Sequence, residues 1–148
     1  MIAAFRIVGL LALVSALLHM VWENSHVGLY TGYDALGGGL PITVFATIGD
    51  VLYTLAAFAL ASLFKHGIEW VRETRWHDFL ALGCLGFFIA LYVEYKALAL
   101  ARWSYLPEMP ILPGFEVGLS PVLQMVILLP LTVAIVGLIE RRISRDIV

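Results

Sequence analysis

Charged residues are scarce in this sequence of 148 residues: they make up 14% of the chain, whereas hydrophobic residues make up 61%. A soluble domain of this length cannot bury so much apolar surface, because surface-to-volume scaling leaves much of a small domain exposed. The composition therefore excludes an ordinary soluble protein and predicts an integral membrane protein whose first partner is the lipid bilayer. The formal net charge of −2 argues against a nucleic-acid partner.

Cysteine is nearly absent as well. Cys84 is the single cysteine and lies in an apolar segment, which excludes a disulfide framework and a Cys-x-x-Cys metal or redox motif. The N-terminal segment has one basic residue, Arg6, and no small-x-small cleavage pattern before Trp22. A secretory signal needs both a basic region and such a cleavage pattern, so we interpret this segment as a retained helix.

Long apolar runs are what the sequence does contain. They cover about residues 2–22, 42–64, 79–101 and 121–139, and each is long enough to cross ~30 Å of hydrocarbon at ~20 residues per crossing. No linker or low-complexity run separates them. The sequence therefore predicts an all-α fold: a single domain, residues 1–148, built as an up-down bundle of four transmembrane helices.

Basic residues outside these runs predict the orientation. They gather after the second and fourth runs, at Lys65, Arg72, Arg75, Arg141, Arg142 and Arg145. Residues 28–41 and 103–120 contain neither lysine nor arginine. Since cytoplasmic loops carry the excess of positive charge, we expect a multi-pass protein of the cell membrane with both termini in the cytoplasm.

The first and second runs carry ionisable residues near their predicted outer ends. His19, Glu23 and His26 are spaced i, i+4, i+7 and so share one helix face. Asp50 lies ~13 Å below Pro41 at 1.5 Å per residue. Each such group costs roughly 2.5–3.5 kcal/mol in the membrane, which makes it a functional candidate.

The other two runs add polar residues at a similar height. Glu94 lies ~10 Å from the outer end of its run, and Gln124 lies about one turn inside the next. The cytoplasmic half, by contrast, reads as leucine, alanine, valine and phenylalanine. We therefore predict a polar, carboxylate-lined pocket in the outer half of the bilayer, roofed by the two outer loops, and no comparable polar group in the inner half.

Acid–base chemistry on an isoprenoid or another lipid is one interpretation of this pocket. A carboxyl group in a low-dielectric site can protonate a double bond and later take a proton back. Glu94 and Asp50 are the candidate acid and base, and Glu23 and His26 would orient the substrate or relay protons. The candidate substrate-binding residues are Tyr53, Tyr95, Arg102, Trp103, Tyr105 and Gln124, whose aromatic members can stabilise a carbocation.

Non-catalytic binding is the alternative. In this interpretation the chain is an accessory protein that holds a small ligand or a divalent metal ion in the same pocket, with His19, Glu23 and His26 as metal ligands. Haem is disfavoured, because His19 and His26 lie on one helix about 10.5 Å apart and cannot both ligate one iron. A transport path through the inner half would need a homo-oligomer or a partner subunit to complete it.

The segment from Arg102 to Gln124 carries a resemblance. It reads Arg-Trp-x-Tyr-x-x-x-Met-Pro-x-x-Pro and then Gly-Leu-Ser-Pro-x-Leu-Gln, a pattern that resembles small uncharacterised four-helix membrane proteins of bacteria. A fainter similarity links Trp103, Tyr105 and Pro121 to the membrane-embedded lycopene cyclase family, which implies an isoprenoid substrate. Where that family has paired glutamates, this chain has Val122, Leu123 and Gln124.

Overall fold

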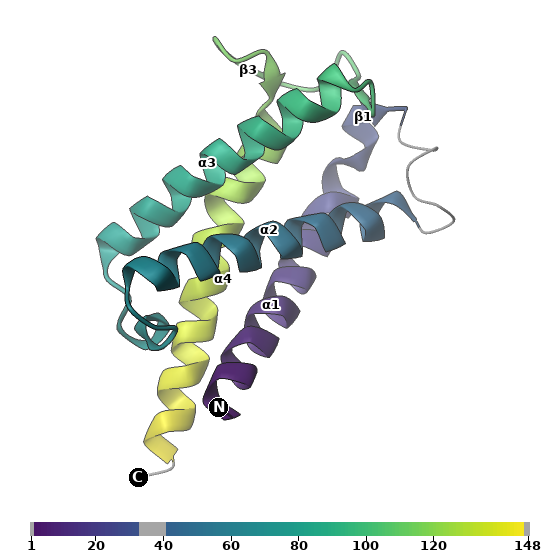
Figure 1. Ribbon diagram of the computed structural model, residues 1–148. Coiled ribbons are helices and arrows are strands. Elements are labelled where there is room, and N and C mark those ends of the chain that lie inside the picture. Colours follow the sequence, from purple (N-terminus) through teal and green to yellow (C-terminus); the bar gives the residue numbers. More distant parts are fainter. Residues whose placement is uncertain (1, 33–40, 147–148) are drawn as a thin grey trace.

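The computed structural model describes residues 2–32 and 41–146, and it is mostly helical (79%). Its long helices are α1 (Ile2–His26), α2 (Ile42–Phe64), α3 (Trp76–Ala99) and α4 (Leu119–Asp146) (Figure 1). Within the described residues, these four helices are long and apolar enough to cross a membrane. The prediction of a helical bundle of the multi-pass membrane type is confirmed at this level.

The helix bounds differ from the apolar runs at most of their ends. The second run matches α2 exactly in extent, whereas α1 continues to His26 and α4 runs from Leu119 to Asp146. Polar residues at helix ends continue the backbone hydrogen bonding, so a run of apolar residues underestimates helix length. α3 begins at Trp76, because the Asp78 carboxylate accepts the Arg75 N–H at 2.9 Å and caps the first turn.

The helices do not pack evenly against one another. α4 packs along both α1 and α3, and α2 packs along α1, whereas α2 and α3 touch little. The start of α1 and the end of α4 lie at the same end of the bundle (Figure 1). α3 approaches α4 very closely at Gly86, where an added Cβ would lie 2.5 Å from the Met125 carbonyl oxygen.

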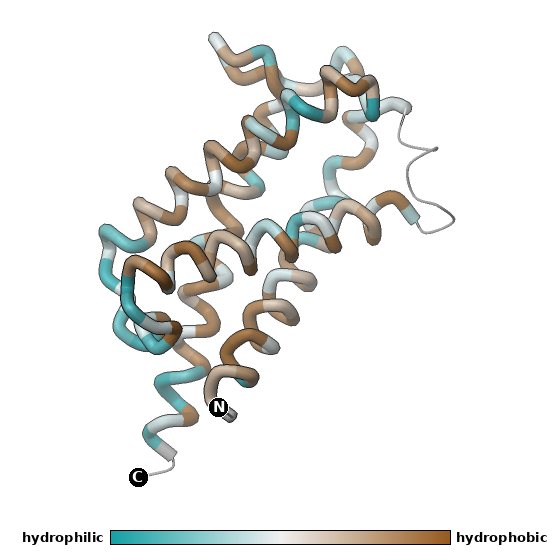
Figure 2. Tube along the Cα trace, in the orientation of Figure 1, coloured by the Kyte–Doolittle hydropathy of each residue, from teal (hydrophilic) through white to brown (hydrophobic). Residues whose placement is uncertain are grey.

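Apolar side chains occur both inside and outside the bundle. Ile7, Leu11, Phe58, Leu129 and Val133 are among the buried residues of the core. Exposed large apolar side chains are found on every long helix, for example Leu17, Leu52, Phe88 and Leu138. Hydrophobic residues dominate along the helices, and hydrophilic ones gather at the turn between α2 and α3 and at the end of α4 (Figure 2). Such a surface suits lipid rather than water as the surrounding solvent.

Short strands connect the segments at the end opposite the termini. After the 3-10 helix η1 (Val27–Leu29), β1 (Tyr30–Thr31) pairs antiparallel with β2 (Ser104–Tyr105), so that Tyr30 lies opposite Tyr105. β3 (Ile111–Leu112) pairs antiparallel with β4 (Val117–Gly118), directly before α4. The β1–β2 pairing ties the two predicted outer loops together. Residues 33–40 of the first loop, which we expected to help roof the pocket, lie outside the described residues.

A buried carboxylate lies at the other end of the bundle. Glu140 is fully buried and accepts hydrogen bonds from Arg6 at 2.7 and 2.9 Å, and from the Arg72 Nη2 at 2.9 Å. Arg72 belongs to the 3-10 helix η3 (Glu69–Glu73), which packs on α4 so tightly that a Cβ on Gly137 would lie 2.3 Å from the Val71 carbonyl oxygen. The prediction that the half of the bundle near the termini lacks comparable polar groups is therefore wrong. Sequence reasoning overlooked Glu140 because it directly follows the fourth apolar run and its arginine partners are distant in sequence.

Candidate functional site

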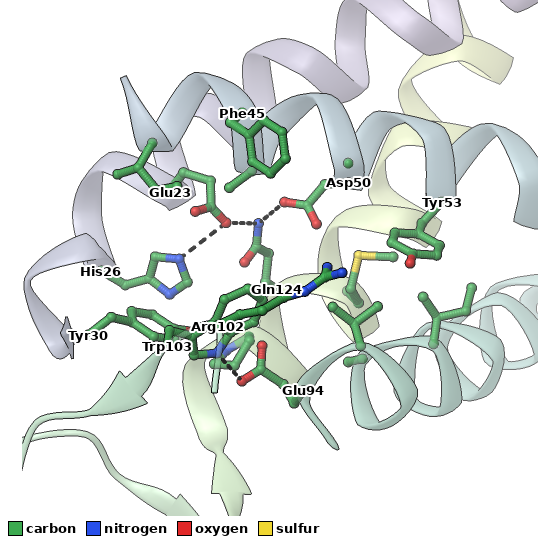
Figure 3. A pocket seen from close by; sticks show the side chains of 18 residues that line it. Glu23, His26, Tyr30, Phe45, Asp50, Tyr53, Glu94, Arg102, Trp103 and Gln124 are labelled. Atoms are coloured by element: carbon green, nitrogen blue, oxygen red, sulfur yellow. Dashed lines mark hydrogen bonds and ion pairs between the residues drawn. The ribbon is translucent and has the colours of Figure 1, made fainter. Parts of the chain in front are cut away.

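The candidate site is a cavity of about 250 Å³ at the end of the bundle opposite the termini. Residues of all four long helices line it, together with Tyr30, Arg102 and Trp103 from the segments that follow α1 and α3. Its polar lining residues are Glu23, His26, Tyr30, Asp50, Tyr53, Glu94, Arg102, Trp103 and Gln124 (Figure 3). Many of its lining residues belong to α2 and α3, which are consecutive in the chain but touch little. The cavity occupies the space that their loose packing leaves.

Gln124 links the polar side chains of three helices. Its Nε2 lies 2.8 Å from Asp50 Oδ2, 2.9 Å from Glu23 Oε1 and 3.0 Å from His19 Nδ1. The Gln124 amide group lies between the Glu23 and Asp50 carboxylates (Figure 3). An amide nitrogen carries only two hydrogens, so Nε2 cannot donate to all of these acceptors at once.

The position of His19 resolves this excess of acceptors. Its Nδ1 lies 3.3 Å from Asp50 Oδ2, and its Nε2 lies 3.4 Å from the Thr54 hydroxyl. If Nδ1 carries the hydrogen, it donates to Asp50, and Thr54 donates to Nε2. The two Gln124 hydrogens are then left for Asp50 and Glu23. We assign this position of the ring hydrogen of His19 from the hydrogen-bond network.

Glu94 is held by two side chains that follow α3. The Trp103 Nε1 donates to Glu94 Oε2 at 3.3 Å, and the Tyr105 hydroxyl donates to the same oxygen in a short hydrogen bond. Burial raises the pKa of the Tyr105 hydroxyl above its ordinary value, and the neighbouring Glu94 carboxylate raises it further. Tyr105 therefore keeps its proton at neutral pH and acts as a donor to Glu94.

His26 lies between Glu23 and the start of α4. Its Nδ1 lies 2.8 Å from the Ser120 hydroxyl, which also accepts a hydrogen bond from Trp22 Nε1 at 3.3 Å. Its Nε2 lies 3.2 Å from Glu23 Oε1, an ion-pair distance without the alignment of a hydrogen bond. The ring also makes an edge contact with Tyr30, with the centroids 5.3 Å apart.

Most residues predicted for the site are brought together. The candidate catalytic residues Glu23, His26, Asp50 and Glu94 line the same cavity, as do Tyr53, Arg102, Trp103 and Gln124. Tyr105 contributes through its bond to Glu94, and His19 lies behind Gln124 and Asp50.

Tyr95 is the exception among the predicted residues. Its side chain is exposed, and its hydroxyl donates to the Phe115 carbonyl oxygen at 2.6 Å, away from the cavity. The next residue of a helix projects about 100° around the axis, so Tyr95 faces outward where Glu94 faces inward.

The three candidate metal ligands are not arranged as a metal site. Within the described residues, no group of three or more histidine, cysteine, aspartate or glutamate side chains could hold a metal ion. The Gln124 amide nitrogen lies within hydrogen-bond distance of both His19 and Glu23, and His26 directs Nδ1 to Ser120. The donor set does not fit a divalent metal ion, and we derive no chemistry through one.

Sequence reasoning missed two contributors. Ser120 is part of the Gly-Leu-Ser-Pro segment before α4, but a serine there is common and gave no distinct signal. Tyr30 lies in a loop, and only its pairing with Tyr105 places it beside His26. Thr54 shares a helix face with Asp50, and from that face we expect a hydrogen bond to a neighbouring helix, as its contact with His19 of α1 confirms.

No protein-family model, curated protein or solved structure matches this chain. The fold and the site define its class as a helical bundle of the multi-pass membrane type with an acidic cavity between α2 and α3.

Proposed function

We propose that this chain is a membrane enzyme that performs acid–base chemistry on an isoprenoid or another lipid. The observation that carries the proposal is that Asp50 of α2 and Glu94 of α3 line one cavity, which also contains Glu23 and His26. Carboxyl groups in a largely apolar bundle are costly, and cheaper hydroxyl or amide groups would suffice to hold helices together.

The lining of the cavity favours a lipid as the ligand. Ile42 and Phe45 of α2 and Ile89 and Val93 of α3 supply apolar walls next to the carboxylates. A second cavity of about 340 Å³ lies further along the same pair of helices, lined by apolar residues such as Leu60, Phe64, Leu82 and Leu85. A lipid could place its reactive end at Asp50 and Glu94 and its tail along the loosely packed seam between α2 and α3.

Hydrogen bonding suggests a role for each carboxyl group. Asp50 and Glu23 contact the same Gln124 nitrogen, and we assign Asp50 the role of the acid. Glu94 accepts from both Trp103 and Tyr105, which suits a carboxylate acting as the base. Faces of Tyr53 and Trp103 in the cavity could stabilise a carbocation formed between them.

The proposed orientation puts this cavity in the outer half of the bilayer. In an up-down bundle with both termini in the cytoplasm, the basic turn between α2 and α3 and the basic end of α4 lie on the cytoplasmic side. The cavity lies at the opposite end, where residues 103–120 have no lysine or arginine. Arg102 at the cavity and Lys96 in the last turn of α3 are then exceptions to the charge distribution, and the Arg102 side chain extends into the cavity (Figure 3).

Exchange with heavy water tests the proposed reaction. Purified protein is reconstituted with total lipid extract of its expression host in D2O, and lipids are analysed by mass spectrometry. An acid–base step at carbon transfers a solvent-derived proton to the lipid, so we expect deuterium at a carbon position that does not exchange without protein. Asp50→Asn and Glu94→Gln should each lower this incorporation by about 100-fold or more.

Tyr95→Phe is the matched control, because Tyr95 follows Glu94 on α3 but lies outside the cavity. It should incorporate deuterium like the unchanged protein. If the unchanged protein incorporates none, the enzyme proposal is wrong. The non-catalytic alternative predicts a different result: a lipid co-purifies with the unchanged protein, is lost in Asp50→Asn, and incorporates no deuterium. This alternative is favoured by the hydrogen bonds that Glu23, Asp50 and Glu94 already make within the protein.

A further inference from the structure

Ser120 lies beside a histidine that itself lies beside a carboxylate. We propose that Ser120, His26 and Glu23 form a nucleophilic relay that cleaves the acyl ester of an amphiphile at the membrane surface. This activity is separate from the proposed chemistry at Asp50 and Glu94. The two sites share Glu23 and His26, whereas Ser120 belongs only to the relay.

The contacts of the relay determine which atom donates each proton and which atom accepts it. Trp22 Nε1 donates to Ser120 Oγ at 3.3 Å, so the serine hydroxyl is free to donate its own proton to His26 Nδ1 at 2.8 Å. Nδ1 is then the acceptor, and the ring hydrogen lies on Nε2, which is 3.2 Å from Glu23 Oε1. In the best-known serine triad, Nε2 faces the serine and Nδ1 faces the carboxylate. Here Nδ1 faces Ser120 and Nε2 faces Glu23, but either nitrogen of an imidazole can serve as the base.

The contact between His26 and Glu23 lacks hydrogen-bond alignment in the free protein. Catalytic hydrogen bonds are often long or poorly aligned without substrate and tighten in the complex. Both side chains are buried, so the imidazolium formed when His26 takes the serine proton would be paired with a carboxylate away from water. This is the orienting and stabilising role that the third member of a triad performs.

Ser120 is reachable from a pocket distinct from the cavity of Asp50 and Glu94. This open pocket is lined by His26, Trp22, Ser25, Leu29, Leu119 and Leu123 around Ser120. His26 is the residue common to both hollows. The mostly apolar lining suits an acyl chain, and the position at the outer ends of α1 and α4 gives access to water.

The position of Ser120 in the first turn of α4 supports the chemistry. The positive end of the helix dipole lies there and stabilises the negative charge that develops on a carbonyl oxygen when a nucleophile attacks. The Leu119 N–H already donates to the Pro110 carbonyl oxygen at 2.7 Å, and Pro121 has no N–H, so the stabilisation comes mainly from the dipole.

The reaction balances without a further cofactor. Ser120 Oγ bonds to the carbonyl carbon of the ester as its proton moves to His26 Nδ1. The bond between that carbon and the leaving alcohol oxygen then breaks, and His26 returns the proton to this oxygen. Water attacks the acyl-serine in the same way, which releases a carboxylic acid and restores the Ser120 hydroxyl.

A long-chain alkyl fluorophosphonate tests the relay directly. Serine attack on this probe forms an Oγ–P bond and releases fluoride, and the labelled peptide is mapped by mass spectrometry. We expect the folded, full-length protein in lipid nanodiscs to be labelled at Ser120. His26→Gln should slow labelling by about 100-fold or more, because the general base is lost, and Glu23→Gln should slow it less.

Ser104→Ala is the control. Ser104 is an exposed serine of β2 that lines neither this pocket nor the cavity of Asp50 and Glu94, so the rate of Ser120 labelling should be unchanged in this variant. Absence of label at Ser120 in the unchanged protein would overturn the proposal, as would an equal rate in a His26→Gln protein that keeps its unfolding temperature. Deuterium incorporation measured on the same preparations shows separately whether the acid–base proposal fails.

Discussion

Gln124 joins three polar side chains at the cavity between α2 and α3. Its nitrogen contacts Asp50, Glu23 and His19, which come from two other helices. An amide at this position adds a donor instead of a further negative charge, which allows two carboxylates to lie close together.

Removing this donor should destabilise the protein. In Gln124→Leu, Glu23 loses its amide donor and Asp50 keeps only His19. A buried acceptor left unsatisfied costs about 1–3 kcal/mol, so we expect a clear decrease in the unfolding temperature in detergent, measured by intrinsic fluorescence. Ile127→Leu, an exposed position on the same helix, is the control and should unfold like the unchanged protein. Equal unfolding temperatures for Gln124→Leu and the control would contradict the assigned network.

Individual site residues could be predicted from depth and helix phase, but their bonds could not. Spacing along each helix placed Glu23, Asp50, Glu94 and Gln124 at a common height, and the structure puts them around one cavity. Spacing cannot show which neighbour a loop residue meets. Tyr105 reaches Glu94 because β2 turns it back, whereas Tyr95 was predicted to be in the site by its height alone and faces outward.

At the scale of the elements, the decisive feature is the difference between two helix pairs. α3 and α4 touch at backbone distance around Gly86, whereas α2 and α3 leave a seam with a cavity towards each end. Helix α3 therefore packs closely against α4 on one side and leaves cavities against α2 on the other side.

Gly86 should be intolerant of any side chain. The added Cβ of Gly86→Ala would lie 2.5 Å from the Met125 carbonyl oxygen, so the backbones of α3 and α4 must separate. We expect a loss of about 1–3 kcal/mol, seen as a lower unfolding temperature. Gly83→Ala is a close match one turn earlier, where the Cβ would meet the Val126 carbonyl oxygen at an ordinary 3.5 Å. Similar unfolding temperatures for the two variants would contradict this close approach.

The apolar runs predicted the helices well, and their ends less well. Helix α2 begins and ends where the sequence changes from apolar to turn-forming residues, so both bounds were predictable. α1 and α4 continue through polar residues such as Glu23 and Glu140, which pair with partners from other elements. Those partners, Gln124 and Arg6, are more than a hundred positions away, and a single sequence does not show such pairings.

For the whole molecule, polarity is distributed between two ends with different chemistry. At one end, Glu140 is paired with arginines and forms a closed ionic cluster. At the other end, Glu23, Asp50 and Glu94 face a cavity and are bonded by neutral donors. The carboxylate at one end is neutralised by its partners, whereas the carboxylates at the other end line a cavity.

The most direct test of this account is where a lipid binds. A long-chain isoprenoid alcohol carrying a diazirine and an alkyne is photo-crosslinked to the protein in nanodiscs, and the modified residues are mapped by mass spectrometry. We expect crosslinks on the cavity-facing residues of α2 and α3, between Ile42 and Tyr53 and between Ile89 and Glu94, and excess unlabelled alcohol should prevent them. Crosslinks spread over outward residues such as Leu17 and Leu138, unaffected by the competitor, would contradict this account.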